Sequence, residues 1–269
     1  MSANTCAEFG GEMGEKNVMV ISSAEQLMEG NTRRNFLKLV GLSGAVIFLP
    51  NVLTSCNSSN NGDITGPPGT GTPVVIDFAK GDTAILQFAY ALEQLEADFY
   101  TKVVANFSGA GFSSGEQTLL TDVKFHEVIH REALKAILGS ANDFTVHTTY
   151  GALNFKDRTA VLGAAKTFED LGVAAYNGAA QYITSTANLL VAGKIVSVEA
   201  RHAAAIRDLI TPKAGGASGA NPDSFAPKSF DDVFSPGKVV GMAQGFVVEK
   251  LTPKNAPTTF VEGPNGNGQ

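Results

Sequence analysis

The chain has 269 residues, of which 20 are lysine or arginine and 26 are aspartate or glutamate, for a formal net charge of −6. This acidic balance, without a clustered basic stretch, excludes a protein that binds nucleic acid through its charge. The two cysteines, Cys6 and Cys56, both lie near the N-terminus. Packing or a metal must therefore hold the rest of the chain together, without an internal disulfide.

The first 55 residues resemble an export signal. Arg33 and Arg34, followed by Phe-Leu-Lys at 36–38, resemble a twin-arginine signal. The apolar run over 39–53 is shorter than the roughly 20 residues that a membrane-spanning helix needs. Leu-Thr-Ser-Cys at 53–56 resembles a lipoprotein cleavage box, with Cys56 as the acylated first residue of the mature protein.

These features predict a twin-arginine lipoprotein signal over residues 1–55 and a membrane attachment through a lipid on Cys56. The expected location is the periplasm or cell envelope, after export by the twin-arginine route. The alternative for Cys56 is an ordinary thiol beside a signal-peptide cleavage site. Both Met1 and Met28 are candidate start residues, because a long stretch precedes the twin arginines.

A polar, glycine- and proline-rich segment follows the cysteine, reading NSSNNGDITGPPGTGTP over 57–73. It has no helical or strand periodicity and predicts a flexible tether over residues 56–77.

Helical periodicity then begins. The first expected helix covers 83–106, with Asp82 as its N-cap, and its wide apolar face predicts that it is largely buried. A Gly/Ser turn leads to a second helix that begins at 115 or 116 and ends at 138, before Gly139.

Residues 140–157 show no helical period and are too many for a hairpin turn, so they predict a crossover along the bundle. A third helix is expected over 158–185, where alanine and glycine predict close helix packing. A fourth helix over 187–210 ends before a proline. The predicted fold is all-α, an antiparallel four-helix bundle with one long crossover over residues 78–211. An irregular C-terminal extension over 212–269 would include a short helix within 236–250.

The bundle contains an internal repeat. LEQLEADFY at 92–100 matches FEDLGVAAY at 168–176, and the pair Glu127/His130 matches the pair Glu199/His202. Residues three apart share a helix face, so each pair points a carboxylate and an imidazole the same way. The first two helices are therefore repeated in sequence by the last two. Such a repeat would place four similar groups of side chains, one from each helix, around one axis.

This arrangement predicts a dinuclear metal site. Two close divalent ions need bridging carboxylates to offset their repulsion and an imidazole each to complete their coordination. Two helices supply one glutamate each and the other two supply Glu-x-x-His. The predicted metal ligands are Glu93, Glu127, His130, Glu169, Glu199 and His202. The alternative is that these residues form ion pairs on the helix surface.

The segments LEQLEADFY, HEVIHREAL, FEDLGVAAYNGAA and VEARHAAAI resemble the ferritin-like superfamily. Within it, the chain resembles the exported, twin-arginine ferritin-like proteins that include desiccation-related proteins. The resemblance covers about residues 78–210 and implies a ferritin-like bundle with two iron or two manganese ions. It also implies that Glu127 and Glu199 bridge the ions, with a terminal glutamate and one histidine on each.

Other residues are expected beside the ligands. Tyr100 and Tyr176 follow the two terminal glutamates by seven residues, on the same helix face. Glu96 lies on an equally apolar stripe, but the repeat aligns it with Gly172, which favours a position beside the ligands over a role as a ligand. His126 and His147 have no partner at ligand spacing and are expected to be structural.

The resulting hypothesis is an exported, membrane-anchored protein whose dinuclear iron or manganese centre reacts with O2 or peroxide, as a ferroxidase, peroxidase or catalase-like protein. One alternative is a non-catalytic envelope scaffold acting in stress or desiccation. Another is an accessory subunit of a membrane complex. No residue is assigned a catalytic role beyond the metal site. The candidate protein partners are a second copy of the chain, in a homodimer, and a membrane complex.

Overall fold

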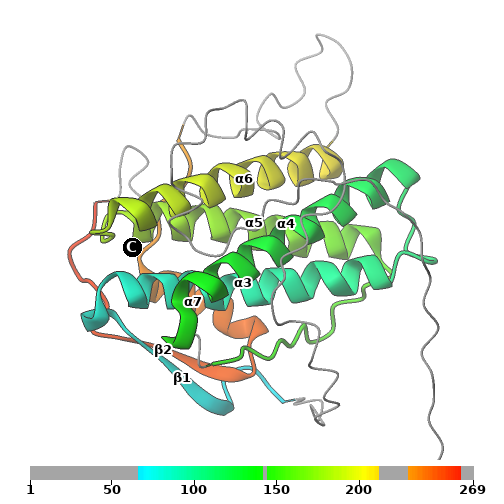
Figure 1. Cartoon of the computed structure of the whole chain (residues 1–269). Coiled ribbons are helices and arrows are strands. Elements are labelled where there is room, and N and C mark those ends of the chain that lie inside the picture. Colours follow the sequence, from blue (N-terminus) through cyan, green and yellow to red (C-terminus); the bar gives the residue numbers. More distant parts are fainter. Residues whose placement is uncertain (1–65, 142–143, 212–229, 262–269) are drawn as a thin grey trace, which may run out of the picture. The chain divides into compact units, whose positions relative to one another are not determined.

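The computed structural model describes residues 66–141, 144–211 and 230–261. The predicted signal and the acylation of Cys56 lie outside these residues. The described part contains four long helices, and they form the expected all-α bundle (Figure 1). These helices are α3 (Asp82–Ala105), α4 (Ser114–Leu138), α5 (Arg158–Ala180) and α6 (Thr186–Ile210). Among the described helices, none is long and apolar enough to cross a membrane.

Local capping explains most helix boundaries. Ser113 and Glu116 form a reciprocal capping box at the start of α4. Asp157 caps α5 by accepting from two backbone N–H groups, and Ser185 caps α6.

Asp82 does not cap α3 as predicted, because Gly81 occupies that position. The Asp82 carboxylate instead accepts hydrogen bonds from the backbone of Thr184 at 2.8 Å and Ser185 at 2.9 Å, and from the Asn188 side chain at 2.9 Å. Burial acts in the opposite direction, but these hydrogen bonds hold the pKa of Asp82 well below its usual value. They also explain why α5 ends at Ala180, five residues earlier than predicted, since the N–H groups at 184 and 185 bond to Asp82.

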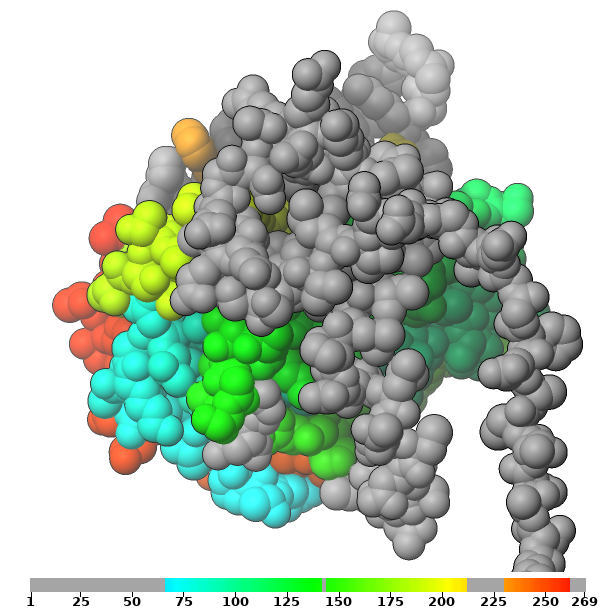
Figure 2. Space-filling model, in the orientation of Figure 1, coloured from blue at the N-terminus to red at the C-terminus, as the bar shows by residue number. Residues whose placement is uncertain are grey.

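The segment expected to complete the tether contains a strand. β1 (Gly71–Asp77) pairs in parallel with β2 (Glu249–Lys254), with Val74 opposite Leu251. Val74 and Ile76 alternate with exposed neighbours and are buried. In the space-filling view, the cyan atoms around β1 lie beside the orange-red atoms of the C-terminal segment (Figure 2).

The C-terminal extension also packs on the bundle. It contains α7 (Pro236–Ala243), shorter than the 236–250 window within which a helix was expected, followed by the turn η3 (Gln244–Phe246) and β2. Gly178 of α5 makes this contact feasible, because a Cβ there would lie 1.8 Å from the carbonyl oxygen of Phe234. The Phe234 N–H donates to the carbonyl of Ala174 at 3.0 Å. The described part of the extension is therefore largely ordered against the helices.

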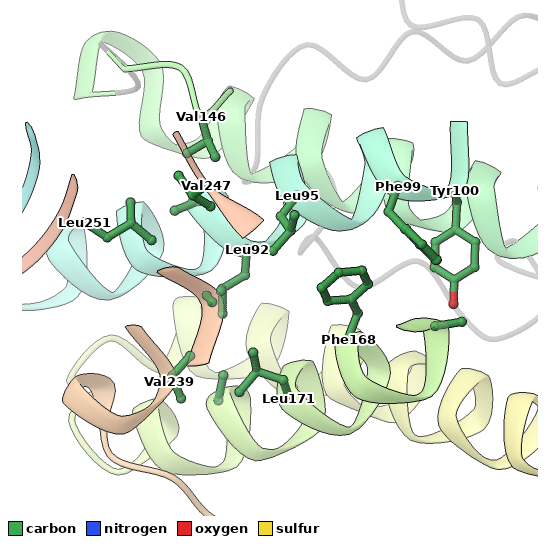
Figure 3. Close-up of a cluster of buried hydrophobic side chains, with 14 of the residues drawn as sticks. Leu92, Leu95, Phe99, Tyr100, Val146, Phe168, Leu171, Val239, Val247 and Leu251 are labelled. Atoms are coloured by element: carbon green, nitrogen blue, oxygen red, sulfur yellow. The ribbon is translucent and has the colours of Figure 1, made fainter. Parts of the chain in front are cut away.

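The main core joins the bundle to both added segments. Figure 3 shows side chains of α3 and α5 packed with Val146 of the crossover and with Val239, Val247 and Leu251 of the C-terminal extension. The turns η1 (Phe78–Lys80) and η2 (Gly139–Ala141) complete the described elements.

Candidate metal centre

Four glutamates and two histidines meet in the middle of the bundle. Helices α3 and α5 contribute one glutamate each, and α4 and α6 contribute one Glu-x-x-His pair each. The four carboxylate residues are 0% exposed. The alternative of solvated surface ion pairs therefore does not hold for this cluster. The six residues are Glu93, Glu127, His130, Glu169, Glu199 and His202.

The six residues form two overlapping groups of four. One group joins Glu93 and His130 to the pair Glu127 and Glu199, and the other joins Glu169 and His202 to the same pair. Within each group one ligand atom per residue lies within 4.8 Å of the others. The arrangement is that of two adjacent sites that share two carboxylates.

In the first site, three carboxylates surround the Nδ1 atom of His130. This nitrogen lies 2.8 Å from Glu199, 3.5 Å from Glu127 and 3.6 Å from Glu93. The Nδ1 atom thus faces both shared carboxylates and one carboxylate that belongs to this site alone.

The second site repeats the pattern around the Nδ1 atom of His202. The distances are 2.8 Å to Glu127, 3.2 Å to Glu199 and 3.4 Å to Glu169. The internal repeat of the sequence therefore reappears as a repeat of geometry.

A tyrosine from the opposite hairpin orients each unshared glutamate. The Tyr176 hydroxyl donates to Glu93 Oε1 at 2.6 Å, and the Tyr100 hydroxyl donates to Glu169 Oε1. The sequence placed each tyrosine on the face of its own helix's glutamate, but the hydrogen bonds cross between hairpins. Burial, and then the nearby carboxylates, raise the pKa of both tyrosines. The hydroxyls therefore stay protonated and fix one oxygen of each glutamate, leaving Oε2 for the site.

Several buried polar atoms of the described cluster make no well-formed hydrogen bond, although His130 Nδ1 and His202 Nδ1 each lie 2.8 Å from a shared carboxylate. They are Oε2 of Glu93 and Glu169, both oxygens of Glu127, Oε1 of Glu199 and Nδ1 of His130. Each orphaned buried atom costs about 1–3 kcal/mol. Carboxylate with imidazole is a donor set that suits iron and manganese. The cluster is therefore compatible with metal binding.

The protonation of the metal-free cluster follows from burial and charge. Burial and the Glu199 charge raise the pKa of Glu127 to about 8. Burial also raises the pKa of Glu169 to about 7, against the attraction of His202. Burial opposes ionisation of Glu199 too, but His130 and His202 outweigh it and lower that pKa to about 2. Metal binding must therefore displace protons from this cluster.

Glu96 lies beside the centre and outside both four-residue groups. A Cβ on Gly172 would lie 3.0 Å from Glu96 Oε1, so the glycine at the repeat-equivalent position makes room for this side chain. Burial, and then the charges of Glu127 and the other carboxylates, raise the pKa of Glu96 well above its usual value. The geometry favours the position beside the ligands over a role as a ligand.

His126 was expected to be structural, yet it contacts a candidate ligand. Its Nδ1 lies 2.9 Å from His202 Nε2, the ring nitrogen that faces away from the carboxylates, and the two rings stack with an interplanar angle of 9°. Its position directly before Glu127 has no helical relation to His202, so no local signal could have revealed the contact. His147 pairs with Glu249 at 2.5 Å, as a structural residue would.

These features define a class of protein, a helical bundle with a buried carboxylate and histidine centre between its hairpins. Residues 81–212 match the family model of the ferritin-like domain. The match covers all four long helices and supports the assignment of this region to the ferritin-like superfamily. A comparison with curated proteins gave no match.

Proposed function

We propose that the bundle binds two ions, of iron or of manganese, and that this centre reacts with dioxygen or peroxide. The observation that supports the proposal most directly is that the two four-residue groups share Glu127 and Glu199. Shared carboxylates are what two close cations require to offset their mutual repulsion.

In this proposal Glu93 and His130 would hold one ion and Glu169 and His202 would hold the other, with the shared carboxylates of Glu127 and Glu199 available to both. The ions would supply the electrons or the Lewis acidity for the reaction. The chain holds the unshared glutamates in place through Tyr100 and Tyr176, and the buried surroundings limit the access of water. Burial and the neighbouring carboxylates raise the pKa of Glu96 and so favour its protonated form.

The twin-arginine stretch and the cleavage box at Cys56 support a second part of the proposal, that the protein is exported and held at the cell envelope by a lipid. Replacing Cys56 by Ser tests it. The wild type should incorporate labelled fatty acid and the variant should not, whereas equal labelling of both, or of neither, would contradict lipid attachment at this residue.

Metal analysis of protein lacking residues 1–55, purified from cells supplied with both iron and manganese, tests the centre. We expect about two ions per chain and near-complete loss in Glu127→Ala. The matched control is Glu132→Ala on the same helix, whose side chain is 50% exposed and should leave metal content unchanged. Unchanged metal in a folded Glu127→Ala would contradict the assignment, and a folded, metal-free wild type would favour the scaffold alternative.

A further inference from the structure

An apolar cavity lies inside the bundle, on the side of the centre that Glu93 and His130 occupy. All four long helices line it with aliphatic or aromatic side chains. Its walls include Leu86, Ala89 and Leu92 of α3, Leu134 of α4, Tyr176 of α5 and Ala192 of α6. The lining therefore combines alanines with larger apolar side chains.

The inner wall of the cavity is in contact with the candidate ligands. The Tyr176 ring lines the cavity while its hydroxyl donates to Glu93 at 2.6 Å. Leu92 directly precedes Glu93, and Leu134 lies one helical turn after His130. A small molecule in the cavity would thus be separated from the centre by little more than one tyrosine ring.

The outer end of the cavity reaches the surface near the connection between α5 and α6. Ala180, Ile183 and Val191 line the cavity and are only partly buried, whereas Tyr176 and Ala192 are buried. The cavity therefore runs from partly exposed residues toward the centre.

Size and polarity restrict what the cavity can hold. Its volume is about 20 Å³, and a site needs about 10–15 Å³ to hold one water. The cavity therefore has room for a molecule somewhat larger than one water. Water and peroxide need several polar partners, and the polar group at the inner wall, the Tyr176 hydroxyl, is engaged by Glu93. An apolar diatomic molecule gives up no hydrogen bonds when it enters a cavity with such walls.

We propose that this cavity is the docking site and entrance for dioxygen, which reaches the Glu93–His130 side of the centre through it. The inference rests on the proposed function and sharpens it, because it favours dioxygen over peroxide as the oxidant. Ala192→Leu should close the site, since Ala192 is 7% exposed and lines the cavity. Val191→Phe, at the partly buried outer end, is a second closing variant that places less strain on the core.

Xenon is an apolar probe of suitable size, and its binding to the metal-free protein tests the site by 129Xe NMR. We expect a bound signal in the wild type, its loss in both closing variants, and its retention in Ala187→Leu. Ala187 is exposed on the same helix and does not line the cavity. A wild type that binds no xenon, or folded closing variants that still bind it, would overturn the proposal. This readout needs no metal, so it stays interpretable if the proposed function fails.

Reaction rates of the metal-loaded protein test the route. Both closing variants should slow dioxygen consumption by the ferrous-loaded protein severalfold, with metal content and the rate with hydrogen peroxide unchanged. An unchanged dioxygen rate, or an equal loss with peroxide, would overturn the assignment of this cavity to dioxygen. A wild type without bound metal would instead refute the proposed function, whatever the xenon result.

Discussion

The two tyrosines that orient the unshared glutamates occupy matching positions in the internal repeat but very different surroundings. Tyr100 is 0% exposed, and its ring lies 5.0 Å from Phe99, which packs 4.8 Å from Phe168. Phe246, from the C-terminal extension, lies 4.7 Å from Phe168 and closes this side. Tyr176, in contrast, forms a wall of the apolar cavity.

The difference shows that ligand geometry and outer packing are separate constraints. The candidate ligands keep the repeat, because two equivalent metal sites would need the same donors. The side chains behind the tyrosines carry no such requirement, so large aromatic residues fill one side and alanines leave space on the other. We call these the closed side, with Tyr100, Glu169 and His202, and the open side, with Tyr176, Glu93 and His130.

Removing the aromatic packing of the closed side should lower the stability of the protein, and this is the largest effect that we predict. Phe168→Ala should lower the free energy of unfolding by about 3–5 kcal/mol, because it removes a fully buried ring and leaves a cavity. Urea denaturation of the metal-free protein measures it, with exposed Phe125→Ala as the control. A loss below about 1 kcal/mol would mean that the closed side is not supported by this cluster.

Loss of His126 should weaken metal binding on the closed side alone. His126 contacts the remote nitrogen of His202, and removing such a partner typically weakens metal affinity by about 10–100-fold. Titration of the metal-free His126→Ala variant should show one weakened ion and one unchanged ion. Equal weakening of both ions, or of neither, would contradict a role confined to His202.

Removing the tyrosine hydroxyl on one side should weaken metal binding there about as much as removing the other hydroxyl does on the other side. Tyr100→Phe and Tyr176→Phe each free one oxygen of an unshared glutamate, so each should weaken one ion by about tenfold. Metal titrations of the two variants, with Tyr182→Phe as the control outside the centre, provide the comparison. A large difference between them would mean that packing also controls ligand orientation.

The pH dependence of stability should be the most gradual effect. The raised pKa values of Glu127, about 8, and Glu169, about 7, mean that the folded metal-free chain holds more protons than the unfolded chain above about pH 4.5. His202, with its pKa raised to about 12, acts in the same direction above about pH 6.5. Burial opposes this shift, and the neighbouring carboxylates cause it.

Stability of the metal-free protein should therefore fall as the pH rises from 5 toward 9. Thermal unfolding across this range measures the slope, which Glu169→Gln should reduce and Glu132→Gln should not. Stability that rises with pH would contradict protonation of these carboxylates.

The sequence alone was sufficient to predict the features that depend on local spacing. Helical periodicity located the four helices to within a few residues, and the repeat selected the six residues that the structure brings together. The alignment of Glu96 with Gly172 placed that carboxylate beside the candidate ligands, because the glycine provides the space it occupies.

Features that depend on contacts between distant segments were missed. Val74 and Leu251 pair across most of the chain, so no local turn signal connects the two strands. The contact of His126 with His202, and the crossing of the tyrosine hydrogen bonds, depend on how the helices are rotated. The cavity depends on which alanines face one another, and composition does not report this.

The pairing of β1 with β2 also sets an order of events during synthesis. All six candidate ligands have been synthesised once the ribosome passes His202, whereas β1 must wait for residues 249–254 before it can pair. Because chains fold as they emerge, the centre can assemble on a nascent bundle whose strand pair is still open. The candidate ligands can therefore come together before the pairing of β1 with β2 completes the fold.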